Sequence, residues 1–92
     1  MKRKKGKERT ITGIVAPQDW DENDNVIRVA IKTPDYMEYI VERNEKGKEL
    51  LVLIDEKVKA TGSVRKRVDG DMIISVNSYE QIKEDEHEED YP

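Results

Sequence analysis

The sequence contains no cysteine and no phenylalanine, and it has only one histidine, one tryptophan and five glycines. Without cysteine the chain has no disulfide framework, no thiolate metal site and no cysteine nucleophile. Its histidine, His87, lies in an acidic run near the C-terminus and is interpreted as a bystander, and no serine has an evident base partner. The glycines are too scattered to form a phosphate-binding loop. We therefore expect no catalysis, no cofactor and no bound metal.

Long hydrophobic runs are also absent. The longest, residues 50–54, is far shorter than the roughly 20 apolar residues of a transmembrane helix. The basic N-terminus is not followed by an apolar segment, so it does not form a secretory signal as it stands. We expect a soluble monomer in the cytoplasm that does not associate with membranes. An exported location remains the alternative.

The formal net charge of −4 hides an uneven distribution along the chain. Residues 1–9 carry six Lys or Arg and one Glu, whereas residues 80–92 carry seven Asp or Glu and one Lys. Because such charged ends cannot bury apolar surface, we predict a disordered basic arm over residues 1–9, a folded domain over 10–82 and a disordered acidic tail over 83–92. The central part is mildly acidic, unlike the basic domain that is typical of nucleic-acid-binding proteins.

The clearest pattern in the folded part is a hairpin over residues 56–82. Its first half alternates apolar and polar residues with the period of a half-buried strand, and the inward set is Val58, Ala60, Gly62 and Val64. The dipeptide Asp69-Gly70 then favours a tight turn. The returning strand has the inward set Met72, Ile74 and Val76, and Tyr79 and Ile82 complete the packing.

The residues upstream predict three more strands. The first covers residues 10–16 and ends at Pro17, with Gly13 at a bulge or a sharp coil where the strand serves two sides of a barrel. Residues 18–25 form a polar loop whose Asp and Asn side chains favour Asx turns; the positions do not fit a calcium-binding EF-hand loop. The second strand covers residues 26–33, with Ile27, Val29 and Ile31 inward and Arg28, Ala30 and Lys32 outward.

The third strand and a helix complete the pattern. The strand covers residues 37–43, with Met37, Tyr39 and Val41 inward. Residues 44–47 break it, and residues 48–55 then favour a short helix, although their apolar run also fits a strand. The sequence therefore predicts an all-β barrel of five strands with one short helix between strands three and four, because a closed sheet leaves few unpaired edges.

Several segments resemble a largely uncharacterised group of small single-domain bacterial OB-fold proteins. Those proteins typically show a V-T-G-x-V first strand, a G-K-E-L-L helix start, a V-x-V-T-G-x-V fourth strand and an I-x-V-x-S-Y-E ending. The corresponding segments here are TITGIV, GKELLVLIDEKVKATGSV and DGDMIISVNSYEQI, within residues 10–82. The resemblance implies the OB-fold, a five-stranded Greek-key barrel, and implies no particular chemistry.

The OB-fold also implies a place for a ligand. In OB-folds the outer face of strands two and three, with the adjoining loops, binds oligonucleotides or oligosaccharides. Mapped onto this sequence, the candidate nucleic-acid-binding residues are Trp20, Arg28, Lys32, Tyr36, Arg65, Lys66 and Arg67.

Six of these residues also have a structural interpretation. Trp20 is either a lid on the end of the barrel, which we favour, or a stacking platform for a base. Arg28 and Lys32 could instead pair with Glu38 and Glu42 across the strands. The run from Arg65 to Arg67 could serve only to keep the hairpin edge from aggregating.

The sequence leaves three functional hypotheses. The first is a non-catalytic OB-fold module that binds single-stranded nucleic acid weakly through the face of strands two and three and the hairpin of strands four and five. The alternative is a protein-interaction or small-ligand-binding module without affinity for nucleic acid. The third is a structural domain without a ligand of its own.

Overall fold

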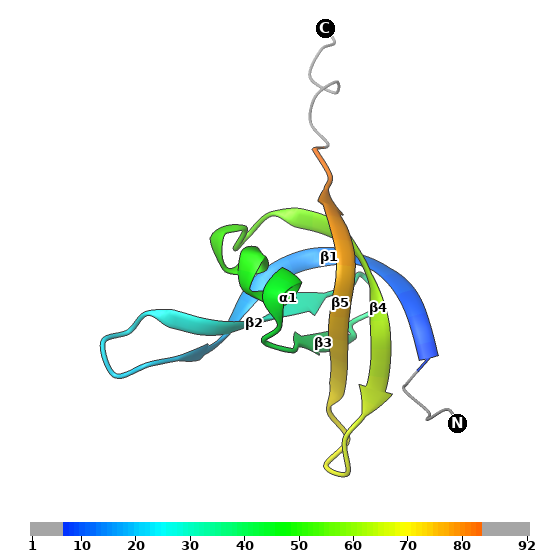
Figure 1. Cartoon of the computed structure of the whole chain (residues 1–92), viewed down its shortest axis with the longest axis horizontal. Coiled ribbons are helices and arrows are strands. Elements are labelled where there is room, and N and C mark those ends of the chain that lie inside the picture. The colour runs from blue at the N-terminus through cyan, green and yellow to red at the C-terminus, as the bar shows by residue number, and fades with distance from the viewer. Residues whose placement is uncertain (1–6, 84–92) are drawn as a thin grey trace, which may run out of the picture.

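The structure, a computed structural model, describes residues 7–83. Within these residues, the sheet closes in a ring with the strand order β1-β2-β3-β5-β4 (Figure 1). The predicted all-β barrel with a short helix after the third strand is confirmed. Apart from residues 7–9 and 83, the predicted arm and tail lie outside the described residues. The elements are β1 (Lys7–Trp20), β2 (Val26–Lys32), β3 (Glu38–Val41), α1 (Glu45–Glu49), the 3₁₀ helix η1 (Leu50–Val52), β4 (Lys57–Lys66) and β5 (Met72–Gln81).

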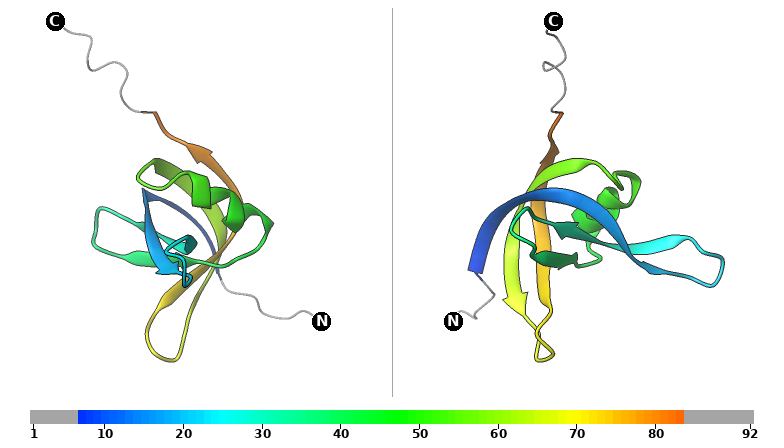
Figure 2. Two further views of the ribbon diagram at one scale, coloured as in Figure 1. Left: turned by 90° about the vertical axis from the view of Figure 1, so that its left-hand side faces the viewer. Right: turned by 180° about the vertical axis from the view of Figure 1, so that it is seen from behind.

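The first strand is long and curved, and it closes the barrel (Figures 1 and 2). Its N-terminal half pairs with β4 and its C-terminal half with β2, and the change occurs at Ile14, which lies opposite both Lys57 and Lys32. Gly13 precedes this point, and a Cβ atom there would overlap the carbonyl oxygen of Lys32. The interpretation of Gly13 as the place where the strand coils to serve both neighbours is therefore confirmed.

Both predicted ends of the first strand are wrong. The strand begins at Lys7 rather than Thr10, because residues 7–9 pair in register with β4 and backbone pairing outweighs their charge. It also continues through Pro17 to Trp20. Pro17 is tolerated because only β2 pairs with this part of β1, and a register shift follows it before Asp19.

The core fills the inside of the barrel. The inward set predicted for β4 is buried as expected, and so are Ile74 and Val76 of β5, while Met72 and Tyr79 are partly buried against them. The prediction is wrong for Met37, which lies outside β3 and is 37% exposed, and Ile27 is only partly buried. The core cluster consists of Ile11, Val15, Val29, Ile31, Tyr39, Val41, Leu50, Val58, Ala60, Val64, Ile74 and Val76.

The helix begins earlier than the sequence predicts. Asn44 caps it, because its Oδ1 accepts a hydrogen bond from the backbone N–H of Gly47 at 2.7 Å. Gly47 is buried, and a Cβ atom there would overlap the carbonyl oxygen of Glu42. The segment over residues 44–47, predicted as a break, is therefore the helix start, and its glycine permits close packing. Leu50 follows and is completely buried in the core.

Candidate ligand-binding face

An apolar row crosses the outside of the barrel. Backbone register aligns Ala30 of β2, Ile40 of β3 and Ile73 of β5, and it continues to Arg65 of β4. Because the residues on either side of each position face the core, these side chains face outward. Ala30 and Ile73 are nevertheless only 0% and 4% exposed, and Ile40 is partly buried. We call these three residues the outer apolar row.

Arg28 lies two residues before Ala30 on β2, on the same side of the strand. Its side chain is partly buried, and its Nε atom is buried without a hydrogen-bond partner. A buried donor without a partner is unfavourable, and most such groups in proteins find one. Once a movement of the side chain uncovers this atom, the Nε–H of Arg28 can therefore donate to a ligand oxygen without breaking an existing hydrogen bond.

Two other candidate cations are paired with carboxylates. Lys32 Nζ lies 3.8 Å from an oxygen of Glu38, as the structural interpretation of Lys32 predicts. Arg65 makes two hydrogen bonds with the carboxylate of Glu42, at 3.1 and 3.4 Å, so Glu42 pairs with Arg65 and not with Arg28 or Lys32. All four side chains are about half exposed, and such pairs contribute only about 0–1 kcal/mol each. Both cations can therefore be drawn to a stronger anionic partner.

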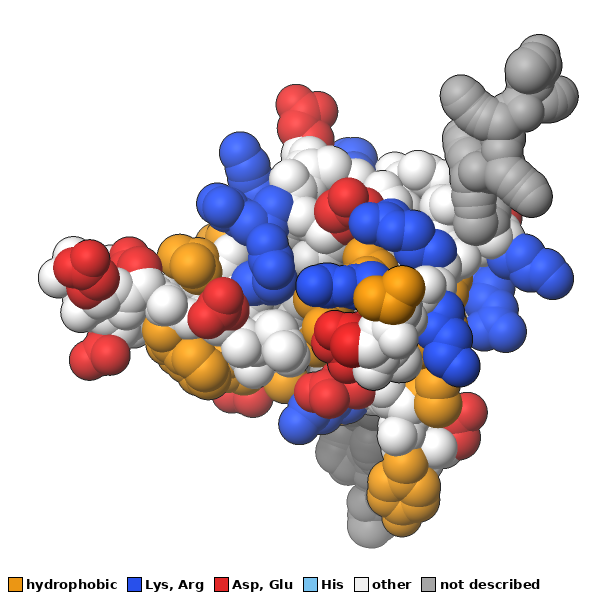
Figure 3. Space-filling view, turned by 90° about the horizontal axis from the view of Figure 1, so that it is seen from below, with side chains coloured by type: hydrophobic (Ala, Val, Ile, Leu, Met, Phe, Trp, Pro, Cys, Tyr) orange, Lys and Arg blue, Asp and Glu red, His pale blue; other side chains and the backbone are white. Residues whose placement is uncertain are grey.

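Lys66 and Arg67 lie at the end of β4 and in the following turn, and both are exposed. Among the residues that the structure describes, neither forms an ion pair. Figure 3 views the molecule from the side toward which the β4–β5 hairpin points, and Lys and Arg side chains lie over the middle of that view with Asp and Glu side chains among them. The acidic side chains at its left edge belong to the β1–β2 hairpin, which extends from the barrel in Figure 1.

The two candidate aromatic residues are far apart. Trp20 lies opposite Val26 at one end of β2, and Tyr36 lies in the turn after the other end. The length of β2 separates them by roughly 20 Å. Trp20 is 50% exposed and does not belong to the core, so its interpretation as a lid is wrong. The reason is that the β1–β2 hairpin carries it away from the barrel (Figure 1).

The tip of the β1–β2 hairpin is negatively charged. The carboxylate of Asp21 accepts backbone N–H groups of Asn23 at 2.8 Å and Asn25 at 3.0 Å, which confirms the predicted Asx turn. The hydrogen bonds from Asn25 and Asn23 lower the pKa of Asp21, so this carboxylate stays ionised at neutral pH. With the exposed Glu22 and Asp24 beside it, the tip repels phosphate near Trp20.

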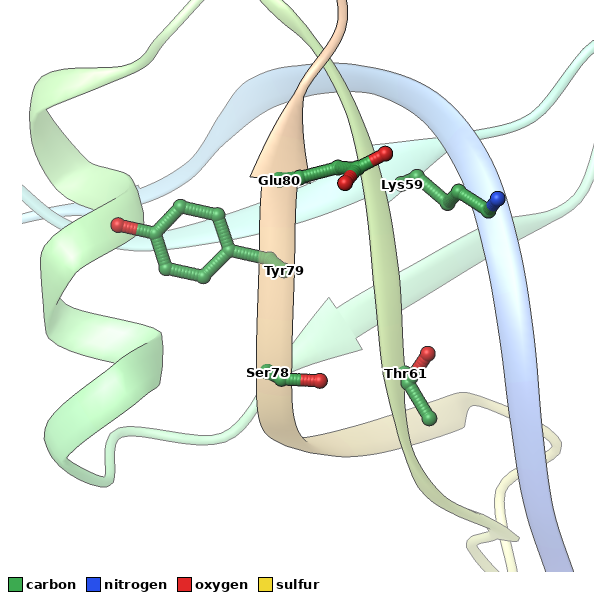
Figure 4. Close-up of a pocket in the computed structure, with 5 residues that line it drawn as sticks. All are labelled: Lys59, Thr61, Ser78, Tyr79 and Glu80. Carbon is green, nitrogen blue, oxygen red and sulfur yellow. The ribbon is translucent and has the colours of Figure 1, made fainter.

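A shallow pocket lies between β4 and β5. It encloses about 300 Å³ and is lined by Lys59, Thr61, Ser78, Tyr79 and Glu80 (Figure 4). Figure 4 shows the ring of Tyr79 pointing toward the helix, where its hydroxyl donates to Glu49 Oε1 at 2.9 Å. This hydrogen bond to Glu49 raises the pKa of Tyr79. Over residues 7–83, no three His, Asp or Glu side chains are grouped to hold a metal ion.

Comparisons with protein-family models, curated proteins and solved structures gave no match for this chain. In the described part of the chain, no helix has the length and apolar character needed to cross a membrane.

The sequence interpretation did not include Ile40 and Ile73 among the candidate residues of the face. Ile40 and Ile73 each stand between two apolar residues in the sequence. Because side chains alternate between the two faces of a strand, the middle residue must face outward when its two neighbours face the core. That signal could have identified the outer apolar row. The partner of Arg65 could not be found in this way, because Glu42 lies 23 residues earlier and only the parallel pairing of β3 with β5 brings it close.

Proposed function

We propose that this chain is an OB-fold domain that binds single-stranded nucleic acid without catalysis. The fold assignment rests on connectivity that fits a five-stranded Greek-key barrel. One coiled strand pairs with both β2 and β4, the helix joins β3 to β4, and β3 pairs in parallel with β5. The binding face is the outside of β2 and β3, extended by the β4–β5 hairpin.

The placement of the partly exposed Ile40 and of Arg28 on the same outer face is the observation that carries this proposal. Bases stack on apolar and aromatic surfaces, while cations along the edge neutralise phosphates. Within the row Ile40 supplies the accessible apolar surface, since Ala30 and Ile73 are covered, and Arg28 supplies a guanidinium group whose buried Nε lacks a partner. Lys66 and Arg67 add two exposed cations at the hairpin.

The ion pairs set the expected salt dependence. For a single strand, each phosphate contact contributes about −0.7 to the slope of log affinity against log salt concentration. If only Arg28, Lys66 and Arg67 contact phosphate, the slope is about −2.1; if Lys32 and Arg65 leave their carboxylates and join them, it is about −3.5. Glu38 and Glu42 compete with phosphate for Lys32 and Arg65. We therefore expect weak, salt-sensitive binding with a slope nearer to about −2.1 than to about −3.5.

Fluorescence anisotropy of a labelled mixed-sequence oligonucleotide, titrated with the full chain at low salt, tests the proposal. The double variant Lys66→Gln/Arg67→Gln should make the slope shallower by about 1.4. The matched control Lys59→Gln/Lys83→Gln removes the same charge at the opposite end of the hairpin and should leave the slope unchanged. Absence of any anisotropy change with the wild-type chain at low salt would refute the function.

The β1–β2 hairpin favours a second candidate, binding of a protein partner. Residues 26–29 of β2 pair only with β1, because β3 pairs with β2 from Ala30 onward. This leaves a strand edge next to the exposed ring of Trp20, and such edges can accept an extended peptide. The acidic tip would select a basic peptide. Quenching of Trp20 fluorescence by a lysine-rich peptide, without any response to the oligonucleotide, would favour this candidate.

A further inference from the structure

Three hairpin turns of the molecule have the same backbone geometry. They cover residues 21–25, 33–37 and 67–71. In each, the N–H of the fourth residue donates to the carbonyl of the first, and the N–H of the first donates to the carbonyl of the fifth. The fourth residue has a positive φ in every case, namely Asp24 at 67°, Tyr36 at 68° and Gly70 at 98°.

Tyrosine is the unusual choice at this fourth position. Glycine adopts a positive φ without strain, and Asp and Asn tolerate it because their short polar side chains form local hydrogen bonds. A side chain such as that of Tyr36 loses a factor of roughly 5–30 in the folding equilibrium constant there. Packing does not compensate, since Tyr36 is 97% exposed. Strained residues of this kind often belong to functional sites.

The surroundings of Tyr36 suit a planar ring. A depression of about 350 Å³ lies beside its turn, lined by Ile11, Thr12, Thr33, Pro34, Asp35 and Tyr39. The hydroxyl of Tyr39 accepts a hydrogen bond from Arg9 Nη1 at 3.5 Å, which places a guanidinium group next to this depression. The site thus combines an exposed aromatic ring, an apolar wall, the hydroxyl of Thr12, a nearby cation, and the carboxylate of Asp35, which accepts a hydrogen bond from the hydroxyl of Thr33.

We propose that Tyr36 and this depression form a separate stacking subsite for one nucleobase, and that the ring is retained there at the expense of folding stability. The inference rests on the proposed function. It adds that the bound nucleic acid runs along β2 and extends beyond Lys32. The base that lies beyond Lys32 is then held by Tyr36. Arg9 would contact the phosphate of the same nucleotide.

Two substitutions of the full chain separate the ring from the backbone strain. Tyr36→Asn should raise the folding equilibrium constant about 5-fold or more in urea denaturation and weaken oligonucleotide binding about 5- to 150-fold, the range for one stacked base. The salt slope should become shallower by at most about 0.7, because releasing this base can cost only the phosphate contact of Arg9. Tyr36→Phe keeps the ring and should bind within about twofold of the wild type.

The outcomes of this experiment are distinct. If the wild type binds the oligonucleotide and Tyr36→Asn binds it with the same affinity, the subsite is overturned and the proposed function stays intact. A Tyr36→Asn variant that is less stable than the wild type would also overturn the inference, because the strain would then be absent. If the wild type itself binds no oligonucleotide at low salt, the proposed function fails, and the subsite fails with it.

Discussion

Neutralising Glu42 should strengthen nucleic-acid binding, because Glu42 occupies Arg65 in the unbound molecule. The carboxylate makes two hydrogen bonds to the guanidinium group, at 3.1 and 3.4 Å. A phosphate must displace it before Arg65 can join the binding face. The substitution Glu42→Gln keeps the shape of the side chain and removes the competing charge.

The magnitude follows from the exposure of the pair. The two side chains are 52% and 42% exposed, so the pair contributes at most about 1 kcal/mol. Releasing Arg65 should therefore raise the affinity by up to about 5-fold at low salt. The salt slope should become steeper by about 0.7, corresponding to one additional phosphate contact. The free energy of unfolding should fall by no more than about 1 kcal/mol.

Anisotropy titrations at several salt concentrations measure both quantities. Glu80→Gln is the matched control, because it changes the net charge equally on an exposed residue of β5 about 25 Å along the strand from the hairpin turn. It should leave the slope at the wild-type value. An equal gain of affinity in both variants would show that only net charge matters, and the assignment of Arg65 to the binding face would be wrong.

Three predictions concern stability. Leu50→Ala should lower the free energy of unfolding by about 2–5 kcal/mol in urea denaturation, because Leu50 is fully buried. The control Val52→Ala, at an 83% exposed position, should change it by less than about 0.5 kcal/mol. Equal effects of the two substitutions would contradict the burial of Leu50. Gly62→Ala should lower the thermal midpoint, since the added Cβ would overlap the carbonyl oxygen of Ser75 at a cost of about 1–3 kcal/mol, and an unchanged midpoint would count against this packing. The pKa of Asp21 is lowered from 3.8, so the ionised carboxylate stabilises the fold above pH 3.8, and this contribution is lost as the pH falls through the lower pKa of the folded state. In urea denaturation, Asp21→Asn should therefore be less stable than the wild type at neutral pH, and this difference should shrink in acid. A difference that does not depend on pH would refute this.

The candidate site was only partly predictable, and the reason differs from residue to residue. Arg28 and Lys32 could be placed on the outer face of β2 from alternation alone. The stacking role of Trp20 and Tyr36 stays a prediction, but their separation could not be foreseen, because it depends on the direction in which the β1–β2 hairpin leaves the barrel. The pairing of Arg65 with Glu42 depends on contacts between strands that are distant in sequence.

By itself the sequence determined the local periods and turns: the inward set of β4, the turn at Gly70 and the Asx turn at Asp21. These follow from side-chain alternation and from the conformational preferences of single residues, which need no distant partner. Only the tertiary structure decided that β1 extends at both ends and that Glu42 lies within hydrogen-bond distance of Arg65. Each of these results from backbone pairing or close packing between remote segments, whose free energy outweighs local propensity and charge.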